Sequence, residues 1–142
     1  MNEKRKDDIY YVCTMIEYVA RITNNHRKEI VSKLAKKGIE HELKVAEVNH
    51  CLSFEQVSDE WIDQYHISMG EFNTVSNCKY TVPSVTSIGR VYQELVIATA
   101  AENEETQATK KKMNATMQAY KEFGKIQEIA DILSTIIETI DG

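Results

Sequence analysis

Hydrophobic residues recur through most of the chain at intervals of three and four residues, a spacing that places them on one face of an α-helix. The first such stripe predicts a helix from about Asp7 to Ile22. The most regular stripe lies near the C-terminus and predicts a long final helix. Its members are Ile126, Ile129, Leu133, Ile136 and Ile140. Both ends of the chain are therefore expected to be helical.

Two shorter helices are expected to follow the first one, before about residue 50. Asn25 is a residue type that caps helix N-termini, and Gly38 stands where a glycine commonly follows the last turn of a helix. The next helix then runs from about Glu40 toward His50. The sequence thus predicts a break between two helices at Gly38.

A fourth helix is expected to begin at Ser53, because Ser53 and Gln56 have the spacing of a capping box. The helical period then disappears between Ile67 and Val82, where glycine, asparagine and serine residues interrupt the chain. Alternating apolar and polar residues within this segment allow either irregular structure or a β-hairpin. Ser84 is placed to cap the helix that follows.

A polar stretch from Ala101 to Lys112 precedes the last helix and is either a solvated helical turn or the loop of a helical hairpin. One proline and five glycines among 142 residues impose few breaks, which favours long helices. A hydrophobic content of 42% suits one folded domain. We therefore predict an all-α, single-domain bundle over residues 1–142. It has about five or six helices and a short irregular or β-hairpin insertion around residues 67–82.

The cysteines and the absence of long apolar runs bear on where the protein resides. Cys13, Cys51 and Cys78 are odd in number and far apart, which does not suit a disulfide framework. Cys13 falls on an apolar stripe and is expected to pack as a small hydrophobic residue. No run approaches the ~20 apolar residues that cross a bilayer, and the first residues are charged. We expect a cytoplasmic protein that does not engage a membrane.

No sequence motif predicts a catalytic, cofactor or metal site. The segment from His41 to Val45 begins like the zinc-protease motif HExxH, but a valine stands where the second histidine ligand is needed. The glycines stand singly, so none belongs to a phosphate-binding loop. For an enzyme of unrecognised type, His50, Cys51 and Trp61 would be the residues to test. We expect no catalysis, no cofactor and no metal.

Charged residues are segregated along the chain, whose net charge is −5. The second predicted helix is basic, and the two helices after it are acidic. Neighbouring helices can neutralise one another, which is the more common arrangement, or the two-signed surface can orient a protein partner. The basic residues are Arg21, Arg27, Lys28, Lys33, Lys36 and Lys37, and the acidic ones are Glu40, Glu42, Glu47, Glu55, Asp59, Glu60 and Asp63.

An aliphatic helix face serves either as core or as an interface, and the stripe of the final helix leaves both open. The function we predict is protein binding without catalysis, through this stripe and the basic cluster. The residues predicted for the partner surface are Ile129, Leu133, Ile136, Ile140, Arg27, Lys28, Lys33, Lys36 and Lys37. The partner can also be a second copy of the chain, in which case the protein is a homo-oligomer.

The alternative function is a DNA-binding regulator of transcription or phage type. The segment from Asn25 to Asn49 can be interpreted as a helix-turn-helix, in which the basic residues would contact phosphates. The second helix of this pair, however, carries Glu40, Glu42 and Glu47 against Lys44. Because phosphates repel such a helix, nucleic acid is the less expected partner.

The final helix ends with Glu138 and Asp141, whereas the C-terminal end of a helix dipole favours positive charge. A basic surface near this end would therefore stabilise the helix. That surface can belong to the second helix of the same chain, to a second copy or to a partner.

The segments IYYVCTMIEYVA and EVNHCLSFEQV lie between Ile9 and Ile67. With the acidic helix that follows them, they resemble a family of small, uncharacterised helical bacterial proteins, often encoded beside toxins resembling ADP-ribosyltransferases. The stretch SVTSIGRVYQELV is also similar to a recurring element of small proteins from gut-type Gram-positive bacteria. The resemblance implies an antitoxin or accessory protein that sequesters a neighbour-encoded partner.

Overall fold

The computed structural model describes residues 1–78, 80–108 and 115–141, with the side chains of residues 105–125 outside the description. Within these residues six α-helices occur and no β-strand, which confirms the predicted all-α bundle. The helices are α1 (Glu3–Thr23), α2 (Arg27–Asn49), α3 (Phe54–Gln64), α4 (Thr74–Asn77), α5 (Val85–Ala108) and α6 (Ala115–Asp141).

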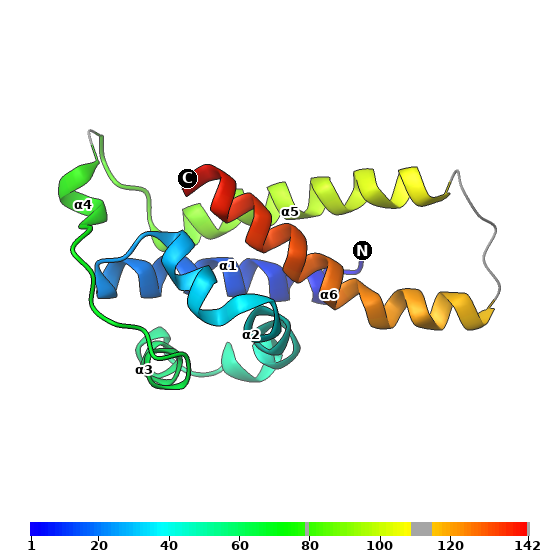
Figure 1. Cartoon of the computed structure of the whole chain (residues 1–142), viewed down its shortest axis with the longest axis horizontal. Coiled ribbons are helices and arrows are strands. Elements are labelled where there is room, and N and C mark those ends of the chain that lie inside the picture. Colours follow the sequence, from blue (N-terminus) through cyan, green and yellow to red (C-terminus); the bar gives the residue numbers. More distant parts are fainter. Residues whose placement is uncertain (79, 109–114, 142) are drawn as a thin grey trace.

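The first helix, α1, lies in the middle of the bundle (Figure 1). Helix α5 packs along it, α2 and α3 also contact it, and α6 packs against both α2 and α5. Helices α5 and α6 extend past the N-terminal end of α1 in Figure 1, whereas α3 and α4 lie toward its C-terminal end. The elements that surround α1 therefore come from both halves of the chain.

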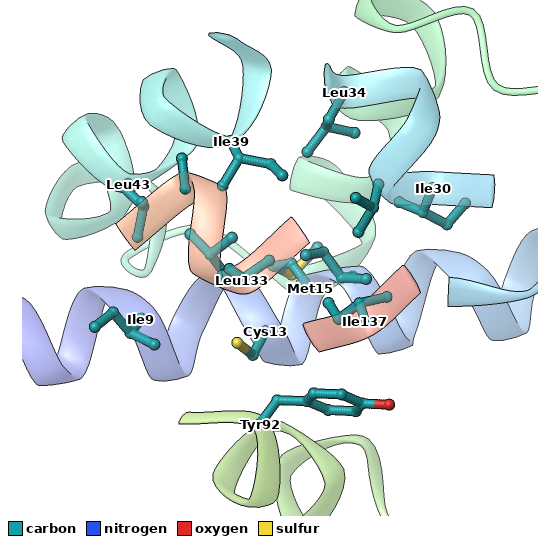
Figure 2. Close-up of a cluster of buried hydrophobic side chains, with 14 of the residues drawn as sticks. Ile9, Cys13, Met15, Ile30, Leu34, Ile39, Leu43, Tyr92, Leu133 and Ile137 are labelled. Carbon is teal, nitrogen blue, oxygen red and sulfur yellow. The ribbon is translucent and has the colours of Figure 1, made fainter. Parts of the chain in front are cut away.

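Side chains from α1, α2, α5 and α6 meet in one hydrophobic core (Figure 2). Met15 of α1, Ile39 of α2 and Leu133 of α6 are fully buried there. Cys13 is also buried, as its place on the apolar stripe predicts, and burial raises the pKa of its thiol. Burial of each large aliphatic side chain contributes about 1.5–3 kcal/mol, so the apolar stripes hold the bundle together.

The starts of α3 and α5 follow the predicted local signals, whereas α1 begins at Glu3, capped by Asn2, rather than near Asp7. Ser53 and Gln56 form the predicted capping box, and the Ser84 hydroxyl accepts a hydrogen bond from the backbone N–H of Ser87. Asn25, in contrast, does not cap α2, because the helix begins at Arg27 and His26 occupies the cap position without a side-chain cap bond. The prediction of an Asn25 cap was therefore wrong, and the Asn25 amide instead donates to the Ser68 carbonyl at 2.9 Å.

The predicted break between two helices is present within α2, but it lies at Ala35 and not at Gly38. The helix continues through Gly38, and the backbone departs from helical geometry at Ala35, where φ is 56° and ψ is 178°. Gly38 is buried, and a Cβ placed on it would lie 2.9 Å from a ring carbon of Tyr65. A glycine at this position allows Tyr65 to pack on α2, so tertiary packing rather than a helix end explains it.

Gly89 has a similar part in the contact between α1 and α5. A Cβ placed on Gly89 would collide with the side chain and backbone of Thr14. Glycine thus permits close approach of the two helices, which makes Gly89 a packing residue inside a helix.

The segment that follows α3 is irregular, apart from the single turn of α4. Apart from Lys79, which is not described, this segment contains no strand. Its described residues therefore do not form the β-hairpin that the sequence allowed. Instead, the N–H groups of Gly70 and Phe72 donate to the carbonyls of Thr23 and Asn24. Bonds to the end of α1 therefore replace the strand pairing that a hairpin needs. Of the predicted polar stretch, residues 101–108 are helical and residues 109–112 lie outside the described residues.

Candidate functional site

The structure divides the predicted partner-binding stripe of α6 between core and surface. Ile129 and Leu133 are 3% and 0% exposed, and Ile136 is half-buried against the core. Figure 2 shows Leu133 among the core side chains of α1 and α2. Ile140 is 54% exposed. Because buried side chains cannot reach a partner, Ile129 and Leu133 are removed from the predicted surface and Ile140 remains on it.

The predicted basic cluster is divided in the same way. Arg27 pairs with Glu17 and Asp141, and Lys36 pairs with Asp131 at 2.5 Å. These ion pairs bind α2 to α1 and α6 rather than to another molecule. The remaining lysines of the cluster, Lys28, Lys33 and Lys37, make no ion pair within the described part of the chain.

A buried ionic network connects α1, α2 and α6. Glu17 is 1% exposed, and its two carboxylate oxygens accept from Arg21 at 2.8 Å and from Arg27 at 2.6 Å. Asp141 accepts from Arg27 at 3.0 Å and from the backbone N–H of Lys28 at 2.9 Å. The basic surface predicted beside the end of the last helix is therefore the start of α2. Glu17 was not predicted from the sequence, although a glutamate inside an apolar stripe is a signal of such pairing.

A cavity of about 310 Å³ lies beside this network. His26 and Phe72 stack in its wall with ring centroids 3.7 Å apart, and Cys78 also lines it. The carboxylates of Glu17 and Asp141 face the cavity, but each of their oxygens already accepts a hydrogen bond from within the chain. Because both carboxylates already have partners, neither Glu17 nor Asp141 offers a free charge to a ligand in the cavity.

The acidic residues of α3 lie on an open surface. Glu55, Asp59 and Asp63 are one helical turn apart, exposed, and without an ion pair among the described residues. No described ion pair joins the predicted basic set to the predicted acidic set. The predicted basic and acidic helices therefore do not neutralise one another through described ion pairs. The basic residues that form ion pairs use Glu17, Asp131 and Asp141 instead.

The second cavity of about 310 Å³ is a groove on the side of α1. Its floor comes from α1, and its walls come from the end of α2, the start of α3 and the start of α5. Aromatic side chains form much of the lining, and Phe54 is also held edge-on against Tyr18 with ring centroids 5.5 Å apart. The groove is lined by Asp7, Asp8, Tyr10, Tyr11, Thr14, Ala46, His50, Phe54 and Thr86.

The charges around this groove leave it acidic. Asp8 is buried and pairs with Lys4 at 3.2 Å, and the same lysine lies 3.6 Å from Glu47. Arg90 stacks over the Tyr10 ring at 4.2 Å and donates to Gln93. Both nearby cations are thus engaged within the chain. Exposed Asp7 makes no ion pair with any described residue.

Buried Glu42 lies close to the groove residue Tyr11 and holds the end of α3. The Tyr65 hydroxyl donates to a Glu42 carboxylate oxygen at 2.8 Å. Burial raises the pKa of Glu42 above its ordinary value of 4.5, although the hydrogen bond from Tyr65 acts in the opposite direction. Burial, and the nearby charges of Glu42 and Glu60, also raise the pKa of Tyr11 to about 12. The contact of α3 with α2 therefore includes a carboxyl group whose charged form is disfavoured by burial.

The Glu42→Gln variant is expected to gain stability relative to the wild type as the pH rises above about 4.5. Because the pKa of Glu42 is raised in the folded state, its contribution to wild-type stability is fully present below the ordinary pKa. The wild type loses this contribution as the pH rises through the raised pKa. Glutamine stays neutral and can still accept from Tyr65. Urea midpoints from about pH 4 to about pH 7 measure the effect. Glu55→Gln, on the exposed face of α3, is the control, and an equal gain there would contradict the prediction.

The residues selected for an unrecognised enzyme do not form one site. His50 and Cys51 are exposed at the end of α2, with the Cys51 sulfur 3.9 Å from His50 Nδ1. Trp61 is buried on the inner face of α3. Only His50 of the three lines the groove.

Among the described residues, no group of three or more histidine, cysteine, aspartate or glutamate side chains has an arrangement that could hold a metal ion. No helix in the described part is long and apolar enough to cross a membrane. No protein-family model, curated protein or solved structure matches the chain.

Proposed function

We propose that this chain is a non-catalytic protein-binding module that holds a segment of its partner in the groove beside α1. The observation that carries the proposal is the lining of the groove, in which Tyr10, Tyr11 and Phe54 meet an exposed carboxylate, Asp7. A volume of about 310 Å³ suits the side chains of a docking segment. Aromatic residues are enriched at protein interfaces, because they combine apolar area with polar atoms.

Other functions have less support from the same residues. The buried carboxylate in the groove, Asp8, is already paired with Lys4, which reduces its value as a catalytic acid or base. A DNA-binding surface would depend on Lys28, Lys33 and Lys37, since Arg27 and Lys36 are engaged in ion pairs. Acidic residues around the groove would also repel a phosphate backbone.

An antitoxin or accessory protein that sequesters a neighbour-encoded partner is the narrower form of this proposal. It is motivated by the resemblance of the segments between Ile9 and Ile67 to bacterial proteins encoded beside toxins. Binding of a partner's segment in the groove is a physical means of such sequestration. A second copy of the chain is the other protein that the proposal admits.

Thr86→Arg is expected to lower partner recovery at least about tenfold, because a long cation in the wall fills the groove. Thr86 is exposed at the start of α5, so the fold should tolerate the change. The matched control is Ala98→Arg, an exposed position on the same helix that does not line the groove. Each variant serves as bait in a pull-down from the natural host at moderate salt, with mass spectrometry of stoichiometric species.

Wild type and Ala98→Arg should retain the same protein, and Thr86→Arg should lose it. Equal recovery by all three would reject the groove as the binding site. Recovery of nucleic acid alone would favour the DNA-binding alternative, and a self-associated species alone would reject sequestration of another protein.

A further inference from the structure

We infer that the occupant of the groove is a basic amphipathic helix of a partner protein, an inference that rests on the protein-binding function proposed above. In this complex an apolar side chain enters between the aromatic walls, and lysine or arginine residues on the same helix face Asp7 and the acidic surface of α3. Charge complementarity and the form of the groove support this occupant.

The carboxylates in and beside the groove outnumber the cations there. Asp7 and Asp8 line the groove, and Glu47 lies near it through Lys4, which is 3.2 Å from Asp8 and 3.6 Å from Glu47. Lys4 and Arg90, which stacks on the Tyr10 ring, stand against these three carboxylates. The groove therefore keeps excess negative charge, which favours a cationic segment and repels an acidic one.

The acidic row on α3 also favours a cationic occupant. Glu55, Asp59 and Asp63 follow one another at intervals of four residues, so their carboxylates are about one helical turn apart. The row begins one residue after Phe54, which lines the groove. Lysine or arginine residues four apart on a neighbouring helix recur about every 6 Å and match this row. Same-face residues of an extended chain recur about every 6.6 Å, so the row supports the charge of the occupant and the form of the groove decides for a helix.

The form of the groove also favours a helix. A partner strand binds by adding to an exposed sheet edge, and the described part of this chain contains no strand. The groove lies between helices, where an amphipathic helix can insert its apolar face. Arg90 stacked on Tyr10 demonstrates that a guanidinium packs well against this aromatic wall.

Three synthetic peptides of about 18 residues test the inference, since this length forms about five helical turns. The first has a leucine face and a lysine face, and the second replaces its lysines with glutamates. The third has the composition of the first in an order without amphipathic spacing. Fluorescence anisotropy measures affinity for the full chain at moderate salt, and NMR shifts of the backbone amides of Tyr10, Ala46 and Thr86 locate the binding.

The lysine peptide is expected to bind at least about tenfold more tightly than either of the other two. Asp7→Lys should weaken it about tenfold, because the exposed carboxylate in the groove is replaced by a like charge. Glu71→Lys changes the total charge equally, on the exposed irregular segment that bonds to the C-terminal end of α1, and should leave the affinity unchanged. Thr86→Arg should abolish the groove shifts.

The outcomes separate this inference from the broader function. If the amphipathic lysine peptide and the lysine peptide without amphipathic spacing bind equally, the occupant is not a helix. If the glutamate peptide binds more tightly than the lysine peptide, the occupant is not basic. In both cases a host partner that is still lost on Thr86→Arg leaves the proposed function standing. If Thr86→Arg affects neither the lysine peptide nor the host partner, the inference and the groove proposal both fail.

Discussion

Replacement of Arg27 by methionine is expected to lower the free energy of unfolding by about 3–5 kcal/mol. The change removes a donor from Glu17, which is 1% exposed, and both guanidinium contacts that connect Glu17 to Asp141. Arg21 still pairs with one Glu17 oxygen, but the other oxygen and the buried Asp141 carboxylate lose their charged donor. A buried carboxylate that loses a donor is unfavourable because it has lost water as well as its partner. Urea unfolding followed by circular dichroism measures the change as a shift in midpoint.

Lys36→Met provides the matched control, because it removes another cation that joins α2 to α6. Its ion pair with Asp131 is exposed to water on both sides, so little stability should be lost. The double variant Glu17→Gln with Arg27→Met should recover part of the Arg27 loss, since a neutral amide tolerates the loss of the Arg27 donor better than the buried carboxylate does. Equal losses for Lys36→Met and Arg27→Met would contradict the importance of burial.

Leu133→Ala is expected to lower the free energy of unfolding by about 2–5 kcal/mol. Leu133 is fully buried between α6 and the helices around it, so a cavity replaces its contacts (Figure 2). Ile140→Ala, seven residues along the same stripe, should change stability by no more than about 0.5 kcal/mol, because Ile140 is 54% exposed. Thermal and urea unfolding of both variants measure the difference.

The same pair distinguishes core packing from partner binding. If Leu133→Ala unfolded no more easily than Ile140→Ala but lost the host partner, the stripe would be an interface and the core assignment would be wrong. If Ile140→Ala alone lost the partner with the fold intact, the surface end of the stripe would belong to the binding site.

The location and type of most helices are predictable from sequence because they depend on local interactions. A period of three and four residues reports the face that a helix buries, whichever neighbour covers it. The capping box of Ser53 and Gln56 and the cap at Ser84 form between residues three positions apart, so their neighbours alone specify them. The all-α class follows from these local signals together with the scarcity of proline and glycine.

The candidate groove was only partly predictable. His50 attracted notice for its chemistry, whereas Tyr10, Tyr11 and Thr86 carry no motif. They become a site because α1, the end of α2, the start of α3 and the start of α5 meet there. Residues so far apart in the chain share no short-range pattern, so sequence spacing does not reveal their proximity.

The sequence by itself determined the helical class, the caps at Ser53 and Ser84 and the apolar faces, because each depends on residues within one or two turns. Tertiary structure decided what those faces contact. It placed Leu133 in the core, used Gly38 for packing with Tyr65, and joined Arg27 to Asp141 across most of the chain. Such choices depend on which distant groups compete for the same space, hydrogen bonds and charge, and only the folded arrangement of the helices resolves that competition.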